Sequence, residues 1–288
     1  NMNINSSFSH KKQEPENSVL YVVGTPIGNL NDISLRALNI LENVSLIACE
    51  DTRQTKKILS KFQIKNTLFS FNEYNSSKKI PNIFCELKAG KSIALVSDAG
   101  LPTICDPGED LIKKAKLNGF KIICIPGPCA ALTALVSSGM PSSKFTFFGF
   151  LPKKKKDRKI LLEEISKSEK TCILYESPHR LKKLLKELKD YCDCEREIQI
   201  FRELTKIFEE HIGTNIEMIL KCFEDKEVIG EITIVINGIQ RENSPEIDKF
   251  ELKKELIDLI NAGLSLSAAS KYLANKKGVQ KSIIYNLY

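Results

Sequence analysis

The feature that most constrains the fold is an alternation of short, β-rich apolar runs with helical patterns between residue 18 and about residue 140. Between these runs, apolar residues recur three and four positions apart, which is the spacing of one helix face. Strands joined through helices run parallel, so the alternation predicts an α/β domain over residues 18–141 with a largely parallel sheet. The candidate strands are VLYVVG (19–24), VSLIAC (44–49), NTLFSF (66–71), SIALVSD (92–98) and FKIICI (120–125).

The segment FGFLPKKKKDRK (148–159) interrupts this rhythm with a turn and a basic loop, and we place a domain boundary just before it, near residue 142. A second α/β domain is expected over residues 142–240. Two of its strands alternate in polarity, which favours a mixed sheet over an all-parallel one. Its candidate strands are KFTFFGF (144–150), TCILYES (171–177), REIQIFREL (196–204) and EITIVING (231–238), with helices at 157–168, 178–191 and 214–224.

The two ends of the chain differ from the middle in composition. Residues 1–17 are polar and predict a disordered tail. Residues 247–288 carry three short helical patterns that resemble a small helix-turn-helix appendage, for which nucleic-acid binding and simple packing on the body both remain open.

The polar start lacks the apolar centre of a signal peptide, and no apolar run reaches about 18 residues. We therefore expect a cytoplasmic protein with no membrane span.

Composition limits the chemistry further. The formal net charge of +7 favours a polyanionic partner such as RNA, although a lysine-rich solvated surface would give the same number. The nine cysteines include no C-x2-C pair, so we interpret them as reduced thiols and expect no metal site. The glycine-rich dinucleotide and triphosphate signatures are missing from the sequence, which argues against NAD and nucleoside triphosphates as ligands.

Three glycine- and proline-rich loops follow strands of the first domain: GTPIGN (24–29), SDAGLPTICDPG (97–108) and PGPCAA (126–131). Ligands of open α/β sheets bind at the carboxyl ends of the strands. Glycine permits close backbone approach and proline fixes the chain, so the three loops predict a ligand held largely by main-chain groups. A stiff turn is the alternative for any one loop alone. We expect Asp106 to cap the next helix and Pro107 to begin it.

Eight segments in order resemble one family. They are LYVVGTPIGNLNDISLRALNIL, ACEDTR, SDAGLPTICDPG, PGPCA, GFLPKK, YESPHR, RELTKIFEE and GEITIVING, spread over roughly residues 18–240. Together they closely resemble the ribosomal RNA small subunit methyltransferase I family of the tetrapyrrole methylase superfamily. The resemblance implies two α/β domains with S-adenosylmethionine in the cleft between them. It also implies a homodimer that methylates the ribose 2′-oxygen of a cytidine in the decoding region of 16S rRNA, on the small ribosomal subunit.

The resemblance further implies a set of cofactor contacts. The turn from Asp98 to Thr103 would contact the methionine and ribose portions of the cofactor, and Pro26 would lie near its methyl group. The second domain would close the site. The implied contacts are Pro26, Asp98, Gly100, Leu101, Thr103, Pro128, Cys129, Tyr175 and Leu204.

Charged side chains after the strands are the candidates for catalysis and RNA binding. A ribose hydroxyl is a weak acid, so a base within hydrogen-bond reach would assist its attack. The candidate catalytic residues are Glu50, Glu176 and Lys206. Lys206 could instead bind a phosphate of the RNA. For each of the three, an ion pair between the domains is the alternative role. Candidates for contacts with RNA are Arg53, His179, Arg180, Arg202 and the run Lys153, Lys154, Lys155 and Lys156.

Two other functions remain open. C-methylation of a tetrapyrrole fits the same superfamily but leaves the basic run unexplained. A non-catalytic RNA-binding or ribosome-assembly module built around residues 250–288 would have no use for three cofactor-type loops.

Overall fold

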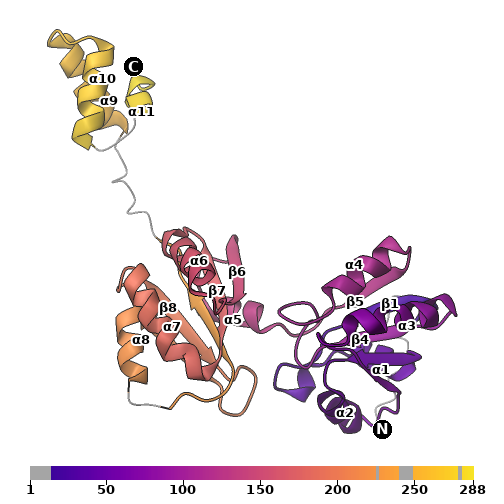
Figure 1. The fold of residues 1–288 in the computed structure, drawn as a ribbon. Helices are drawn as coiled ribbons and strands as arrows, with labels where there is room; N and C mark the ends of the chain where they lie inside the picture. Colours follow the sequence, from indigo (N-terminus) through magenta and orange to yellow (C-terminus); the bar gives the residue numbers. More distant parts are fainter. Residues whose placement is uncertain (1–13, 225–226, 240–248, 278–280) are drawn as a thin grey trace. The chain divides into compact units, whose positions relative to one another are not determined.

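The computed structural model describes residues 14–224, 227–239, 249–277 and 281–288 (Figure 1). The chain divides into two compact units, Asn1–Ile239 and Gln240–Tyr288. Residues 1–13 of the expected tail lie outside the described residues. Residues 14–17 include Glu14, which binds Arg36 through both carboxylate oxygens, and Glu16, whose N–H donates to the Tyr21 hydroxyl.

The first sheet has the strand order β3-β2-β4-β1-β5, and every pairing in it is parallel, as the alternation predicted. Successive residues of β1 face opposite sides: Tyr21 packs with α1 and α2, whereas Leu20 packs with α3 and α4. Both faces are therefore covered by helices. The elements are β1 (Val19–Val23), the 3-10 helix η2 (Leu30–Asp32), α1 (Leu35–Asn43), β2 (Leu46–Cys49), α2 (Thr52–Lys61), β3 (Leu68–Ser70), α3 (Ser76–Lys88), β4 (Ile93–Val96), α4 (Glu109–Leu117) and β5 (Lys121–Ile125).

The second sheet has the order β6-β7-β10-β8-β9 and is mixed, which confirms the expectation: β6 and β7 are parallel, and the other pairings are antiparallel. Helices α6, α7 and α8 cover one face. The elements are α5 (Ala130–Ser138), β6 (Phe145–Phe150), α6 (Lys155–Lys167), β7 (Thr171–Glu176), α7 (Pro178–Tyr191), β8 (Glu197–Arg202), β9 (Glu210–Asn215), α8 (Ile216–Phe223) and β10 (Ile232–Ile236).

Helix α5 packs on the other face of this second sheet, although it precedes residue 142. Its Ala134 and Leu135 share a core with Phe201 and Val235, and Ile27 from the first loop joins the same core. The first and second sheets are thus connected through shared apolar packing around α5.

Two local predictions were wrong. Helix α4 begins at Glu109 and its N-cap is Gly108 at φ 136°, so Asp106 and Pro107 neither cap nor begin it. A side chain at position 108 would approach Leu95 Cδ2 at 2.9 Å, which explains why glycine stands there. Helix α6 begins at Lys155, so the basic run is not all loop.

The second unit has a small core of its own. Three helices, α9 (Lys249–Asn261), α10 (Leu266–Lys277) and α11 (Lys281–Tyr285), pack together through Leu252, Leu256, Ala269, Leu273 and Ile284. These are the helices that the sequence predicted. Among the described residues, no helix combines the length and apolar character that crossing a bilayer requires.

Candidate active site

A cavity of about 360 Å³ lies at the carboxyl ends of the strands, between the first and second sheets. Its volume falls in the range of small-molecule sites. Both sheets contribute to its wall. The lining residues are Ile27, Ala99, Gly100, Leu101, Ile104, Cys105, Asp106, Cys129, Ala130, Phe150, Tyr175, Glu176, Ser177, Pro178, Leu204, Gly230, Glu231, Ile232 and Thr233.

The three glycine- and proline-rich loops meet beside this cavity through main-chain contacts. Thr25 and Gly100 exchange backbone hydrogen bonds of 2.9 and 3.0 Å. A Cβ on Gly24 would lie 2.7 Å from the Cα of Gly127, so the first and third loops touch where neither has a side chain. The loops therefore form one rigid frame, with Gly100 turned toward the cavity.

The central loop carries unusual backbone angles. Thr103 and Cys105 have φ values of 74° and 63°, in the left-handed region that residues with a Cβ rarely occupy. Such residues concentrate at ligand-binding sites, where the surrounding structure holds the strained conformation. Here the segment from Ile104 to Asp106, which includes one of these two residues, lines the cavity.

Three carboxyl groups give one side of the site a negative potential. Burial raises the pKa of Asp106 to about 6, opposed by a hydrogen bond from Ser97 and reinforced by the charge of Asp98. Burial, together with the charges of Asp98 and Asp106, also raises the pKa of Glu50. Burial also raises the pKa of Asp98. The hydrogen bond of 3.0 Å that its carboxylate accepts from the N–H of Asp51 opposes this rise. In the described part of the chain, no ion pair joins these three carboxyls to a cation.

The opposite side is aromatic and apolar. The Tyr175 hydroxyl accepts a hydrogen bond of 3.1 Å from the N–H of Ala131, at the start of α5. Its ring lies 5.1 Å from that of Phe147 and 5.6 Å from that of Phe150, measured between centroids. Burial raises the pKa of Tyr175, so the phenol stays protonated. This wall can pack against a flat or apolar ligand group.

Five residues implied as cofactor contacts line the cavity: Gly100, Leu101, Cys129, Tyr175 and Leu204. Four others do not line it: Pro26, Asp98, Thr103 and Pro128. Each of these four lies within one of the three loops, immediately next to a lining residue. Asp106, which the sequence interpreted as a helix cap, belongs to the wall instead.

The candidate catalytic residues differ in how far their charges are already paired. Glu176 is 3% exposed, and its Oε1 accepts the N–H of Ser177 at 2.7 Å and lies 3.0 Å from Arg180 Nε. Its Oε2 lies 3.9 Å from Arg158 Nη2 and has no hydrogen-bond partner among the described residues. Glu50 is half-buried and does not line the cavity.

Lys206 lies at the edge of the cavity, between two carboxylates. Its Nζ is 2.9 Å from Glu203 Oε1 and 2.8 Å from Glu231 Oε2. Burial lowers the pKa of Lys206, but the hydrogen bonds to Glu231 and Glu203 outweigh it and raise the pKa overall. The side chain is therefore held as an ammonium, and Glu231 places this pair at the cavity wall.

None of the candidate RNA-binding residues lines the cavity. The guanidinium of Arg53 donates hydrogen bonds from Nε and Nη2 to the carboxylate of Asp51, and these bonds lower the pKa of that carboxyl to about 2. Arg202 pairs with Glu210, and His179 is exposed in the first turn of α7. Lys153, Lys154, Lys155 and Lys156 are all exposed, and no ion pair within the described residues involves them.

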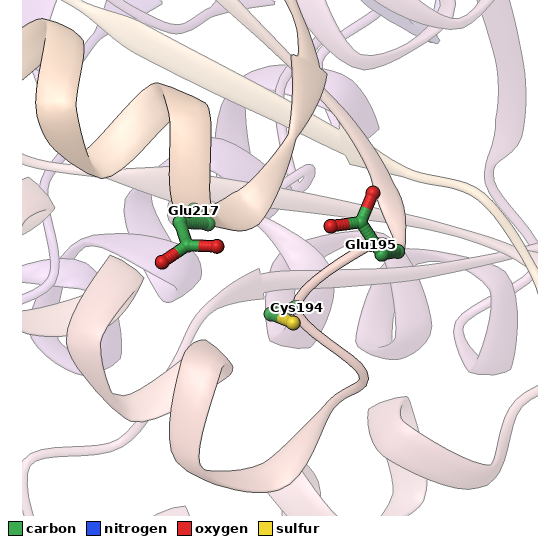
Figure 2. Close-up of side chains that lie close together, drawn as sticks. All are labelled: Cys194, Glu195 and Glu217. Atoms are coloured by element: carbon green, nitrogen blue, oxygen red, sulfur yellow. The ribbon is translucent and has the colours of Figure 1, made fainter.

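One group of ligand-type atoms lies outside the cavity. Figure 2 shows Glu217 in the first turn of α8, with Cys194 and Glu195 on the segment that leads into β8. Lys189 Nζ is 3.4 Å from Glu217, and Asn215 donates to Glu195 at 3.0 Å. These neighbours already account for the two carboxylates, and we assign no metal to the group.

Comparison with known proteins gives consistent matches. The family described as Tetrapyrrole (Corrin/Porphyrin) Methylases matches residues 19–219. Proteins named ribosomal RNA small subunit methyltransferase I are similar along most of the chain. The Vibrio cholerae protein is 40% identical over 269 residues, 93% of each chain, and the Bacillus subtilis protein is 40% identical over 277 residues, 94% of each. The Thermotoga maritima protein is 45% identical over 219 residues, which are 76% of this chain and 98% of that protein.

Solved structures share the fold at much lower identity. A cobalamin biosynthetic enzyme, cobalt precorrin-4 methyltransferase, has a TM-score of 0.60 at 15% identity, covering 76% of this chain and 95% of its own. A uroporphyrin-III C-methyltransferase from Thermus thermophilus, complexed with S-adenosylhomocysteine, has a TM-score of 0.54 at 14% identity, covering 76% and 96%. The two-sheet architecture is therefore that of known methyltransferases.

Proposed function

Because this chain belongs to the ribosomal RNA small subunit methyltransferase I family of tetrapyrrole methylases, we propose that it methylates a cytidine ribose of 16S rRNA. The methyl group comes from S-adenosylmethionine and goes to the 2′-oxygen of a nucleotide in the decoding region. The reaction takes place in the cytoplasm on the small ribosomal subunit. The observation that carries the proposal is the cavity, which joins main-chain loops to the carboxyl of Asp106, a group with no ion-pair partner among the described residues.

The residues of the cavity fit this cofactor. S-adenosylmethionine carries an ammonium and a sulfonium, and the wall offers Asp106, a carboxyl withdrawn from water and without an ion-pair partner in the described chain. Its adenine is a flat aromatic ring system, and Leu101, Cys129 and Leu204 offer an apolar surface to its faces. The Asp98–Thr103 turn and Pro128 would hold the ligand through main-chain groups, with Pro26 near its methyl group. When bound, the cofactor supplies a methyl group activated by positively charged sulfur.

The chain's own residues then position the ribose and receive its proton. Catalysis by positioning requires that the attacking oxygen be held close to the methyl carbon, at about 3–3.5 Å. Burial raises the pKa of Glu50 and so makes its carboxylate a stronger base, and we assign proton acceptance to it from just outside the cavity lining. Lys206, kept charged by Glu203 and Glu231, stabilises negative charge that develops on the hydroxyl oxygen.

Glu176 supports the site from within the cavity wall. Its carboxylate is buried and bound by Arg180 and Ser177, so it fixes the wall at the end of β7. Arg53, His179, Arg180, Arg202 and the lysine run then contact the phosphates that flank the target. The homodimer implied by the resemblance remains part of the proposal, and the exposed Leu132 and Val136, one turn apart on α5, offer an apolar surface for it.

The decisive experiment maps 2′-O-methyl groups on 16S rRNA from cells that lack this protein. We expect one cytidine of the decoding region to lose its methyl group, and purified protein with S-adenosylmethionine to restore it on small subunits. Calorimetry should separately show S-adenosylhomocysteine binding to the isolated protein. An unchanged methylation map would refute the rRNA assignment, and an absent heat of binding would refute the cofactor assignment.

A further inference from the structure

Strand β6 contains a bulge that changes where its last aromatic side chain points. Its parallel register against β7 pairs Phe147 with Ile173, then Gly149 with Leu174 and Phe150 with Tyr175, so Phe148 is an extra residue. Paired residues of neighbouring strands share a face of the sheet. Phe147 and Phe150, three positions apart, therefore lie on the face of Tyr175. Without the bulge, Phe150 would point to the opposite face.

The bulge is built for close contact with the central glycine- and proline-rich loop. Gly149 has a φ of 61°, and a Cβ there would lie 2.7 Å from the Sγ of Cys105, which lines the cavity. Bulges beside functional sites commonly re-aim a side chain. Here the bulge directs Phe150 to the cavity wall and packs the strand against the loop from Ser97 to Gly108.

The Phe150 ring is supported on one side and open on the other. Tyr175 holds it at 5.6 Å between centroids, and Tyr175 is itself fixed by the N–H of Ala131. Phe150 nevertheless remains 51% exposed while lining the cavity. A large aromatic side chain that is held rigid and left open offers a preformed surface for a flat ligand.

The lysines near Phe150 indicate which kind of flat ligand would pack on its ring. Lys153 follows Phe150 by three residues, and Lys153–Lys156 are exposed and without ion pairs in the described part of the chain. Single-stranded nucleic acid is bound by this combination, because aromatic rings stack on its bases while cations contact its phosphates. The adenine of the methyl donor is the competing occupant, since it too is flat and belongs to the same cavity.

We propose that Phe150 is a stacking platform for a base of the RNA substrate at the mouth of the cavity, set in place by the bulge at Gly149. The inference rests on the proposed function and adds the residue that positions the nucleotide. Lys153–Lys156 hold the phosphates next to that base.

Affinity measurements on three variants test the platform. Phe150→Ala should weaken binding of unmodified decoding-region RNA by about 5- to 150-fold, the cost of losing one stacked base. Phe150→Trp should retain the affinity. The matched control is Phe145→Ala, on the same strand, 39% exposed and outside the cavity lining, which should bind as the wild type does. The slope of affinity against salt should be unchanged in Phe150→Ala, because no phosphate contact is lost.

A fluorescence measurement reports the stacking itself. The chain contains seven tyrosines but no tryptophan, so Phe150→Trp introduces the one indole, which can be excited at wavelengths that tyrosine does not absorb. Its emission should be quenched by the RNA and little affected by S-adenosylhomocysteine, whereas Phe145→Trp should respond to neither. Calorimetry with S-adenosylhomocysteine should give the same affinity for Phe150→Ala and the wild type.

The possible outcomes distinguish a failure of the stacking proposal from a failure of the proposed methyltransferase function. If Phe150→Ala binds RNA normally while the wild type methylates small subunits, the platform is wrong and the proposed function stands. If Phe150→Ala instead loses affinity for S-adenosylhomocysteine, the ring belongs to the adenine site and the inference is overturned. A wild type that neither binds RNA nor methylates subunits refutes the proposed function itself.

Discussion

Asp106 places a carboxyl on the cavity wall where water is scarce, and its pKa rises to about 6 from 3.8. A carboxyl with a higher pKa in the folded chain stabilises the fold most below pH 3.8 and loses that contribution as pH rises through about 6. Asp106→Asn should therefore have a higher free energy of unfolding than the wild type at pH 8, by about 1–2 kcal/mol after screening by the solvent that reaches this half-buried side chain, with the difference shrinking toward pH 4. Urea unfolding across this pH range measures it, and a pH-independent difference would contradict it.

The same substitution should have the opposite effect on ligand binding. If Asp106 faces the cationic part of the methyl donor, its neutral variant binds S-adenosylmethionine more weakly while folding more stably. Functional sites commonly trade stability for binding in this way. A variant with both higher stability and unchanged donor affinity would show that the ligand's charge is met elsewhere.

Gly24 and Gly127 stand where two loops touch backbone to backbone. A Cβ on Gly24 would lie 2.7 Å from Gly127 Cα, and backbone cannot rotate away as a side chain can. Gly24→Ala should cost about 1–3 kcal/mol of stability and weaken donor binding, because the loops must separate. Gly90→Ala is an informative comparison: position 90 has open space around it but a φ of 86°, so its cost is conformational and should spare donor binding.

The loops around the site could be predicted from sequence, but two of its side chains could not. The rule that ligands bind at strand ends places GTPIGN, SDAGLPTICDPG and PGPCAA together, and the structure does bring them together. Asp106 was misplaced because D-P before a helix is typical of a cap, whereas Gly108 at φ 136° takes that position. Phe150 was missed because a bulge is a property of strand pairing, which one strand's sequence does not reveal.

At the scale of elements, a buried ion network ties α6, β7 and α7 together. Arg158 on α6 donates to Glu187 on α7 at 2.6 and 2.9 Å and lies 3.9 Å from Glu176 at the end of β7. Removing one member of a buried pair leaves the other charge uncompensated, at a cost of about 3–5 kcal/mol. Arg158→Ala should show that loss in urea unfolding.

The neighbouring residue provides the control for this network. Lys159 pairs with Glu163 at 3.7 Å on the surface of the same helix. Exposed pairs contribute about 0–1 kcal/mol, so Lys159→Ala should change stability little. Equal losses in Arg158→Ala and Lys159→Ala would mean that helix formation, rather than the buried network, is what both measurements report.

The basic run is partly helical, and this gives its replacement two separable effects. Lys155 and Lys156 lie in the first turn of α6, where the helix dipole disfavours positive charge. Replacing Lys153–Lys156 with serine should leave stability unchanged or slightly higher. RNA affinity should fall, and the salt slope should flatten by up to about 3, because four phosphate contacts to a single strand are lost. An unaltered slope would identify the run as a solvated surface.

Most strands of both sheets were recognisable because they are short, apolar and β-branched; the exception was β9. Its sequence EHIGTN has one apolar side chain facing the core, and as an edge strand it pairs only with β8 among the described strands. Periodicity carries no signal for such a strand. The expected helix at 214–224 correspondingly begins two residues later, at Ile216, after Asn215 caps it.

At the scale of the whole molecule, the boundary placed near residue 142 does not follow the packing. Helix α5 comes before it but packs on the second sheet, in a core that also contains Ile27 from the first loop. Sequence composition marks where turns and basic runs occur, whereas packing depends on which face each helix buries. The cavity is lined from both sheets, as the family resemblance implied when it placed the cofactor between two domains.

The second unit, Gln240–Tyr288, has a core that shares no described residue with the cores of the first. The similar Thermotoga maritima protein is matched over 98% of its length by 219 residues of this chain. A chain ending at Ile239 should therefore fold and bind S-adenosylhomocysteine as the full chain does, with calorimetry and thermal unfolding as the measurements. If the three helices contact RNA, this shortened chain should bind small subunits more weakly and with a flatter salt slope, yet still methylate them when they are saturating. Loss of S-adenosylhomocysteine binding on removal of residues 240–288 would instead show that the appendage supports the cavity.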